Sequence, residues 1–217
     1  MEMKKKISIV SGCWNEEGNL PEFYERITAV FRKLPQYEYE ILIADNHSTD
    51  RSREILRELA GRDKRLKVIF NSNNFGVIRS GFNAFLQAGG DAVVLMCSDL
   101  QDPPEKIPEF LRKWEEGYDV VCAVKAGSPE AFPMRMVREF YYWLLKKSAE
   151  DELISGFYGF GLYSRRFQEA VKRFHEPYPY FRGLVSEIGL KRIEVPFVQE
   201  KRRSGRSSYN FFSYYDT

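Results

Sequence analysis

The chain has 217 residues, enough for one large domain but too few for two independent cores. Apolar residues make up 43% and charged residues 29%, a composition that excludes a disordered or low-complexity protein. The 33 basic residues are nearly balanced by 31 acidic ones, and the net charge of +2 gives no general attraction to nucleic acid. Nucleic acid is therefore not an expected partner.

The first 125 residues alternate between strand-like and helix-like patterns. Strands are expected at residues 7–13, 39–45, 66–70, 92–97 and 118–124, and helices at 20–34, 52–60, 77–88 and 104–114. The expected strands are apolar on both faces, which is typical of a parallel sheet that helices cover on both sides. We therefore predict an α/β fold.

The pattern changes after residue 126. Residues 132–147 predict an amphipathic helix with aromatic, aliphatic and basic side chains, which suits either a membrane interface or a core-packed helix with a solvated edge. A glycine and aromatic stretch at 156–161 precedes expected helices at 164–174 and 180–190 and a strand at 192–198. The longest apolar runs are short, and none is long enough to span a bilayer.

Polar residues collect where three of the expected strands end. Asn15 follows the first strand, Asp45 ends the second, and residues 98–102 follow the fourth. Ligands of open parallel sheets bind beyond the carboxyl ends of the strands. The chain has neither the GxGxxG nor the GxxxxGK[ST] phosphate-binding motif, so a divalent cation is the expected way to hold phosphates. Asp99 and Gln101 offer the oxygen ligands that Mg²⁺ or Mn²⁺ prefers.

These residues belong to a series of motifs: Trp14-Asn15-Glu16-Glu17, Asp45-Asn46-His47-Ser48-Thr49-Asp50, Asn74-Phe75-Gly76, Gly90-Asp91 and Asp99-Leu100-Gln101-Asp102-Pro103-Pro104-Glu105. The series resembles the family 2 glycosyltransferases of GT-A fold. Within that family the chain is most similar to the polyprenyl-phosphate, dolichol-phosphate mannose synthase-like branch. The resemblance continues through Ser164-Arg165-Arg166, Phe181-Arg182-Gly183-Leu184, Val195-Pro196-Phe197 and the segment 202–209, and so covers nearly the whole chain.

The resemblance implies a GT-A, Rossmann-like α/β fold: a mainly parallel sheet flanked by helices, with C-terminal amphipathic helices and a basic loop. Residues 1–125 would form the half that binds the nucleotide sugar. Residues 126–217 would form the acceptor and membrane-proximal part of the same domain. Five aromatic residues among the last nine also suit a lipid headgroup boundary. Because relatives often continue into C-terminal transmembrane helices, we expect the chain to be truncated before such helices.

The resemblance also implies roles for individual residues. The expected nucleotide contacts are Asn15, Glu17, Asp45, Asn46, Asn74 and Ser98. The expected metal ligands are Asp99 and Gln101, which together with Arg202 form the expected catalytic set. The residues expected to meet the diphosphate or the acceptor phosphate are Arg182, Arg202, Arg206 and Ser207. A glycine-containing basic loop suits this task because arginine can bind phosphate with two hydrogen bonds, although a solvated basic surface would have the same sequence.

Three departures from the family pattern affect the chemistry. Cys97 stands where the metal motif usually has its first Asp, and a thiol is a poor ligand for Mg²⁺, so we expect the metal to bind more weakly. Asn46 replaces a frequent second Asp, and Gly159 falls where many relatives have a further Asp. Cys97 and Cys13 are expected to end neighbouring strands as buried, reduced thiols of a cytosolic protein.

The missing carboxylate favours a phosphate acceptor. A phosphate monoester has a second pKa of about 6 and is already an anionic nucleophile at neutral pH, whereas a hydroxyl group needs a general base. We therefore expect an inverting transferase that moves a sugar from a UDP- or GDP-linked donor to polyprenyl phosphate at the cytoplasmic face of the membrane, with a possible homo-oligomer.

Two alternatives stay open. One is a transferase that extends a surface polysaccharide on a sugar hydroxyl, with Asp151 or Glu152 as the base. The other is a catalytically silent binding module that keeps the fold and has lost the metal with the first Asp.

Overall fold

The computed structural model of the chain describes residues 4–126, 154, 156–174 and 180–201. The amphipathic helix expected at 132–147 lies outside the described residues. So do the acidic pair Asp151 and Glu152 and the basic segment that begins at Arg202.

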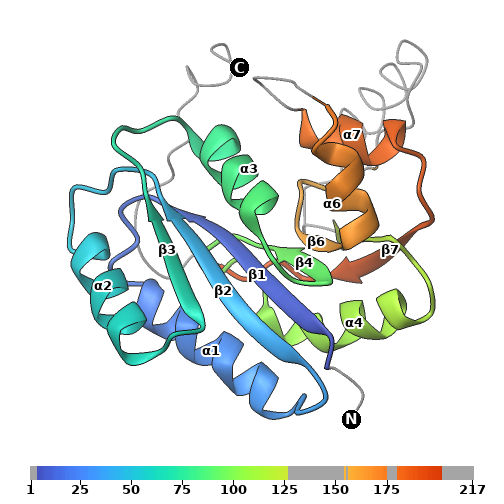
Figure 1. Ribbon diagram of the computed structural model, residues 1–217. Coiled ribbons are helices and arrows are strands. Elements are labelled where there is room, and N and C mark those ends of the chain that lie inside the picture. The colour runs from blue at the N-terminus through green and yellow to red at the C-terminus, as the bar shows by residue number, and fades with distance from the viewer. Residues whose placement is uncertain (1–3, 127–153, 155, 175–179, 202–217) are drawn as a thin grey trace, which may run out of the picture.

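The described residues form a seven-stranded sheet in the order β3-β2-β1-β4-β6-β5-β7 (Figure 1). The strands are β1 (Lys6–Cys13), β2 (Glu38–Asp45), β3 (Leu66–Phe70), β4 (Ala92–Leu95), β5 (Val120–Lys125), β6 (Gly161–Ser164) and β7 (Arg192–Phe197). Strand β6 is antiparallel to both neighbours, β4 and β5, and every other neighbouring pair is parallel. The prediction of a mainly parallel α/β sheet is confirmed.

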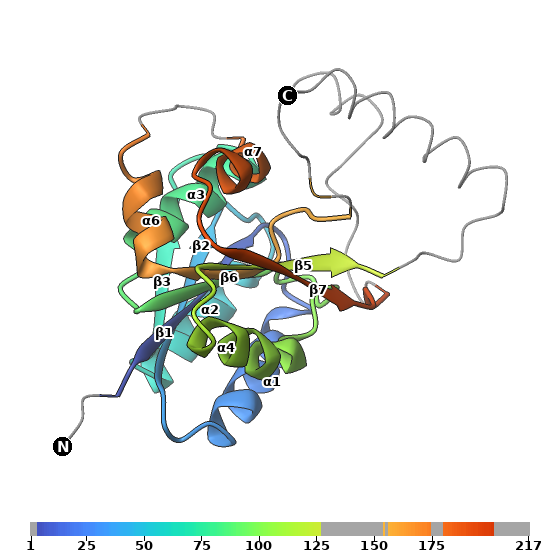
Figure 2. The same cartoon turned by 90° about the vertical axis from the view of Figure 1, so that its right-hand side faces the viewer.

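Helices cover both faces of this sheet. One face carries α1 (Leu20–Arg32), α2 (Ser52–Arg62), the short 3₁₀ helix η1 (Pro104–Lys106) and α4 (Ile107–Glu115). The other face carries α3 (Val77–Gln87), α6 (Arg165–Val171) and α7 (Phe181–Glu187). Figure 2 shows α1 and α4 below the sheet, with α3, α6 and α7 above it. Among these described helices, none has the length and hydropathy needed to cross a membrane.

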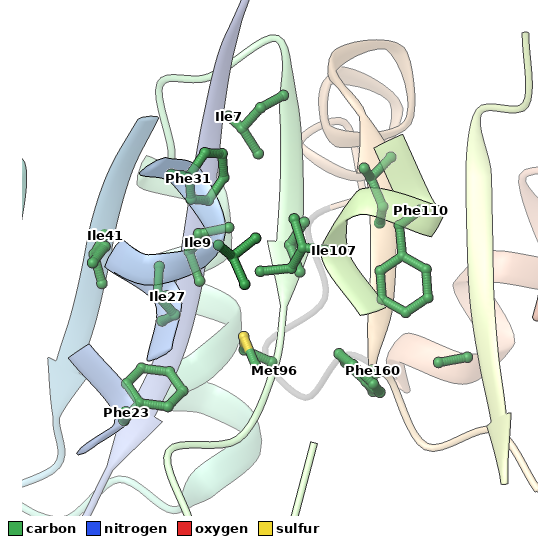
Figure 3. Packing of buried hydrophobic residues seen from close by; sticks show 14 of the residues in the cluster. Ile7, Ile9, Phe23, Ile27, Phe31, Ile41, Met96, Ile107, Phe110 and Phe160 are labelled. Atoms are coloured by element: carbon green, nitrogen blue, oxygen red, sulfur yellow. The ribbon is translucent and has the colours of Figure 1, made fainter. Parts of the chain in front are cut away.

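Successive residues of the central strands point to opposite faces of the sheet. Ile9 of β1 lies in one cluster with Phe23 and Ile27 of α1 (Figure 3). Its neighbour Val10 belongs to the cluster on the other face, which contains Phe85 of α3. Both strand residues are fully buried. Burial on both faces explains why the strands read as continuous apolar runs in the sequence.

Strand β6 corrects the prediction for the second half of the chain. Its residues were expected to lead directly into a helix, but they pair with Ala92–Leu95 on one side and with β5 on the other. The strand has four residues and begins at Gly161, where an added Cβ would collide with the carbonyl oxygen of Val121. Such a short strand shows no clear two-residue periodicity, so its sequence pattern did not reveal it.

The register brings the loops after β1, β2 and β4 to one edge of the sheet. Cys13 at the end of β1 is opposite Asp45 at the end of β2, and Leu95 at the end of β4 is opposite Val10. Each of the three following loops contains a non-glycine residue with a positive φ: 55° at Asn15, 64° at His47 and 63° at Leu100. Backbone of this kind is strained and is common at functional sites.

Candidate functional site at the carboxyl ends of the strands

The loops after β1 and β2 are joined through the side chain of Asn15. Its Oδ1 accepts hydrogen bonds from the backbone N–H of Thr49 at 2.8 Å and of Asp50 at 3.4 Å. The backbone N–H of Asn15 donates to Ser48 Oγ at 2.9 Å, and the Glu17 carboxylate accepts from the backbone N–H of Arg51 at 2.9 Å. These bonds fix two loops that the sequence analysis expected to hold the nucleotide.

The loops after β2 and β3 are joined by asparagine side chains. Nδ2 of Asn46 donates to Oδ1 of Asn74 at 2.7 Å, and Oδ1 of Asn46 accepts from the backbone N–H of Phe75 at 2.9 Å. Asn46 is buried. In this arrangement both asparagines stabilise the loops, and a direct contact with the nucleotide stays a prediction.

Asp45 is fully buried beneath the same loops. Its two carboxylate oxygens lie 3.3 and 3.4 Å from the backbone nitrogen of Ser48, which donates to them, and Oδ2 lies 3.2 Å from Nε of Arg53. Ser98, also predicted to contact the nucleotide, is buried and donates its hydroxyl hydrogen to the Gly12 carbonyl at 2.8 Å. Both side chains therefore support the loops from below.

The predicted metal ligands lie in the loop after β4, which we call the motif loop (residues 97–102). Asp99 and Gln101 are partly exposed, while Leu100 between them is fully buried. The backbone N–H of Gln101 donates to Oδ1 of Asp99 at 3.1 Å, and this bond orients the carboxylate. Leu100 has a left-handed backbone and packs in the hydrophobic core. The two predicted ligands on either side of it stay partly accessible to solvent.

A buried carboxylate closes the motif loop. Asp102 accepts a hydrogen bond from the backbone N–H of Cys97 at 2.8 Å and a short one from the hydroxyl group of Tyr158. Burial raises the pKa of Asp102 to about 6, although both hydrogen bonds act in the opposite direction. Tyr158 belongs to the glycine and aromatic stretch before β6, so this contact joins the motif loop to the second half of the chain.

Cys97 differs from the expectation of a buried thiol. Strands β1 and β4 are neighbours, as predicted, and Cys13 is buried, but Cys97 is exposed. Gly159, another departure from the family pattern, has a φ of 113°, a backbone conformation that an aspartate would adopt only with strain. The backbone at position 159 is therefore unfavourable for an aspartate.

The predicted basic residues are only partly placed. Nη1 of Arg182, on α7, donates to the carbonyl oxygen of Phe157 at 3.4 Å, and its guanidinium carbon lies 5.4 Å from the centroid of the Tyr180 ring. Phe157 precedes Tyr158, so Arg182 and the motif loop contact the same turn. Three further predicted residues lie outside the described part of the chain: Arg202, Arg206 and Ser207.

A divalent cation fits this site through oxygen ligands. Asp99 offers a carboxylate that is already oriented, and Gln101 offers an amide oxygen two residues later. Within residues 4–126, 154, 156–174 and 180–201, no group of three or more His, Cys, Asp or Glu side chains could hold a metal ion. A cation held by this loop would therefore need further oxygen ligands, such as those of a bound diphosphate.

Three residues of this region were missed as site elements. The motif that contains Asp102 predicts no role for it, Tyr158 belongs to a stretch that predicts none, and the sequence around Arg53 gives no sign of its contact with Asp45. The stretch at 156–161 is rich in glycine and aromatic residues, a composition that is unusual for a helix. This composition was the sequence signal that Tyr158, and with it Asp102, has a special role.

The sequence of the chain matches a known protein family and individual members of it. The family described as "Glycosyl transferase family 2" matches residues 8–177. The uncharacterized glycosyltransferase YkcC of Bacillus subtilis is 38% identical over 206 residues, which are 93% of this chain and 62% of that protein. The undecaprenyl-phosphate 4-deoxy-4-formamido-L-arabinose transferase of Photorhabdus laumondii is 33% identical over 216 residues, 97% of this chain and 65% of that protein.

The fold has relatives among solved structures. The mannosyltransferase PcManGT from Pyrobaculum calidifontis, in complex with GDP-Man and Mn²⁺, superposes with a TM-score of 0.62 at 18% identity, over 91% of this chain and 56% of that one. The prediction of a GT-A fold is confirmed. The chain spans slightly less than two thirds of the length of the Bacillus subtilis and Photorhabdus laumondii relatives. From the extent of the family match and the identity to these relatives, the chain belongs to glycosyltransferase family 2.

Proposed function

We propose that the chain transfers a sugar from a nucleotide sugar to polyprenyl phosphate. The observation that carries this proposal is the motif loop, where Asp99 and Gln101 lie partly exposed at the carboxyl edge of a parallel sheet. Ligands of open parallel sheets bind at that edge. A relative that is 33% identical is named as an undecaprenyl-phosphate sugar transferase, which supports the acceptor class.

The nucleotide would lie over the joined loops after β1 and β2. Asn15 and Glu17 lie at the surface of these loops and would contact the base and ribose, while Asp45 and Ser98 would act from beneath. Asn46 and Asn74 would hold the third loop against the ligand through their mutual hydrogen bond. The hydrogen bonds among these loops are made before any ligand arrives, so less ordering entropy is lost on binding.

The donor diphosphate would lie at the motif loop. Asp99 and Gln101 would hold a divalent cation there, and that cation would supply charge neutralisation for the departing nucleoside diphosphate. Mn²⁺ in a structure of the same fold supports a divalent cation. With only two protein ligands and an exposed thiol at Cys97 in place of a third, the affinity for Mg²⁺ or Mn²⁺ would depend on the bound diphosphate.

The transfer itself is an in-line displacement. An oxygen of the acceptor phosphate forms a bond to the anomeric carbon, and the bond from that carbon to the donor phosphate oxygen breaks with its electron pair, so the configuration inverts. Arg182, together with the predicted phosphate contacts Arg202, Arg206 and Ser207, would stabilise the negative charge that develops on the diphosphate.

The local carboxylates favour a phosphate over a hydroxyl acceptor. Asp102 is buried and held by Cys97 and Tyr158, so it is poorly placed to remove a proton from a substrate. The φ of 113° at Gly159 disfavours a carboxylate there. A phosphate monoester needs no such base at neutral pH. Since this acceptor is a lipid, the reaction would take place at a membrane surface, and we expect that surface to be the cytoplasmic face.

A paired-acceptor assay tests this proposal. The purified chain, in lipid nanodiscs, is given a panel of UDP- and GDP-sugars with Mn²⁺, and either polyprenyl phosphate or the corresponding polyprenol. We expect sugar transfer to the phosphate alone. Transfer to the polyprenol as well would refute the requirement for a phosphate acceptor.

Calorimetric titration with UDP and GDP, each with and without Mn²⁺, separates an enzyme from a silent module. Metal-enhanced binding of one nucleotide is the expected result and identifies the donor class. Binding of neither nucleotide, in a chain shown to be folded, would contradict the proposal.

A further inference from the structure

One guanidinium group outside the predicted site holds two carboxylates from distant parts of the chain. Arg26 on α1 donates to Glu105 of η1 through Nε at 2.9 Å and Nη2 at 2.5 Å. It also donates to Glu200 through Nη2 at 2.7 Å and Nη1 at 3.3 Å. The Arg26 side chain is 16% exposed, so these ion pairs are partly shielded from water.

The residues that Arg26 holds adjoin the motif loop on both sides. Glu105 lies three residues after Asp102 in η1, and Glu200 lies three residues after the end of β7. The backbone N–H of Glu200 donates to the carbonyl oxygen of Gln101 at 3.1 Å. Figure 2 shows β7 beside β5 with both strands pointing in the same direction. Glu200 follows the end of β7 in the sequence.

These contacts form a continuous path from α1 to the predicted metal ligands. Arg26 fixes the Glu200 carboxylate, the Glu200 N–H fixes the Gln101 carbonyl, and the Gln101 N–H fixes the Asp99 carboxylate. The bidentate geometry restricts rotation of both glutamates, because a planar guanidinium group presents its donors in a fixed arrangement.

We propose that Arg26 is a positioning residue for the motif loop, which it acts on through Glu105 and Glu200. Arg26 would set the orientation of Gln101 and Asp99 toward a divalent cation and the diphosphate of the donor, without touching either. This inference rests on the proposed function for its ligand. Its structural part, the restraint on the Glu200 to Gln101 contact, does not depend on any ligand.

Amide hydrogen exchange tests the structural part. In the Arg26→Gln variant we expect the Glu200 amide to exchange roughly tenfold faster, because loss of the ion pairs lowers the free energy of local opening. The amide of Ile43 in β2, a strand that is paired on both sides, serves as an internal reference for global stability. Arg62→Gln is the matched control, since Arg62 pairs with Glu58 on the exposed surface of α2 and the Arg62 side chain is 76% exposed.

Nucleotide titration tests the consequence for the site. Using whichever of UDP and GDP the unaltered chain binds, we expect Arg26→Gln to reduce the Mn²⁺-dependent gain in affinity roughly fivefold and to leave the metal-free affinity unchanged. Arg26→Lys should restore the gain only in part, because one ammonium group cannot make two bidentate pairs. A purely structural role would lower both affinities and speed the exchange of Ile43 and Glu200 equally.

The outcomes separate this inference from the proposed function. Unchanged exchange at Glu200 in Arg26→Gln, or an equal increase at Glu200 and Ile43, would overturn the positioning role. If Arg26→Gln shows the same metal-dependent gain in affinity as the unaltered chain, the proposed effect of Arg26 on the site is overturned. If the unaltered chain binds neither nucleotide, the proposed function fails, and the exchange at Glu200 still decides whether Arg26 holds the motif loop.

Discussion

Carboxylates at the two ends of the parallel strands differ in burial and in hydrogen bonding. At the amino ends, the carboxylate of Glu40 is buried and accepts four hydrogen bonds: from Lys6 at 2.5 Å, Ser8 at 2.7 Å, Lys67 at 2.8 Å and the backbone N–H of Gly89 at 2.9 Å. Burial alone would raise its pKa, but these donors lower the pKa to about 2. The carboxylate at this end therefore stabilises the fold.

At the carboxyl ends, Asp99 is partly exposed and its carboxylate is oriented by the N–H of Gln101 within its own loop. The three non-glycine residues with positive φ in the described part of the chain, Asn15, His47 and Leu100, all lie at this end. Strained backbone and a carboxylate with remaining coordination capacity are expected where a ligand completes the arrangement. The comparison predicts that substitutions at the two ends affect different properties.

The largest expected effect is the loss of metal-dependent function in Asp99→Asn. We expect turnover of the nucleotide sugar to fall at least roughly 100-fold, because an amide cannot replace the carboxylate as a charged metal ligand. The melting temperature should stay within a few degrees of the unaltered chain. Asp91→Asn is the matched control, since Asp91 precedes the amino end of the same strand. Equal loss of activity in both variants would show that the two ends are not functionally distinct.

The second effect is a loss of stability in Glu40→Gln. Removing the charge of the buried Glu40 carboxylate leaves the more exposed Lys6 and Lys67 without their shared partner, and we expect a cost of about 2 kcal/mol in the free energy of unfolding. Denaturant unfolding at pH 7 measures this cost. Binding of the nucleotide by the folded variant should be unchanged. A variant as stable as the unaltered chain would contradict the stabilising role of this end.

The pH dependence sharpens the same test. Because the native pKa of Glu40 is about 2 against an ordinary value of 4.5, the folded state favours the ionised form. The stability that Glu40 contributes is complete above its ordinary pKa and is lost as the pH falls toward 2. The difference in stability between the unaltered chain and Glu40→Gln should therefore shrink between pH 5 and pH 3. A difference that grows on acidification would have the wrong sign.

A smaller effect is expected for Tyr158→Phe, which removes one donor to the buried carboxylate of Asp102. We expect a loss of about 1 kcal/mol in unfolding free energy, because Asp102 keeps the Cys97 N–H as a partner. In Tyr158→Phe we also expect a lower affinity for the nucleotide in the presence of Mn²⁺. Tyr118→Phe is a suitable control at a tyrosine outside this loop. A change in Tyr118→Phe of the same size would show that loss of any tyrosine hydroxyl has this effect.

The sequence was sufficient for features that depend on local patterns. Apolar runs predicted the buried parallel strands, and polar residues at their ends predicted the end of the sheet where the loops that carry Asn15, Asp45 and Asp99 lie. It was insufficient for contacts between distant segments. Tyr158 and Asp102 are 56 residues apart and Arg26 and Glu200 are 174 apart, so no local periodicity connects them. The roles of the predicted site residues stay predictions until ligand binding is measured.

The smallest expected effect comes from Cys97→Asp, which restores the carboxylate usual in the family pattern. Cys97 is exposed at the start of the motif loop, two residues before Asp99, so a carboxylate there would reach a cation that Asp99 and Gln101 hold. We expect Mn²⁺ to bind roughly threefold more tightly in the presence of nucleotide, because a hard oxygen replaces a thiol. Without metal, the added charge near Asp99 and Asp102 should lower the stability slightly through like-charge repulsion. Calorimetry with Mn²⁺ and denaturant unfolding measure the two effects, and Cys97→Ser controls for loss of the thiol. Tighter binding in the serine variant as well would show that the thiol itself weakens the site, whereas weaker binding in the aspartate variant would mean that position 97 does not face the cation.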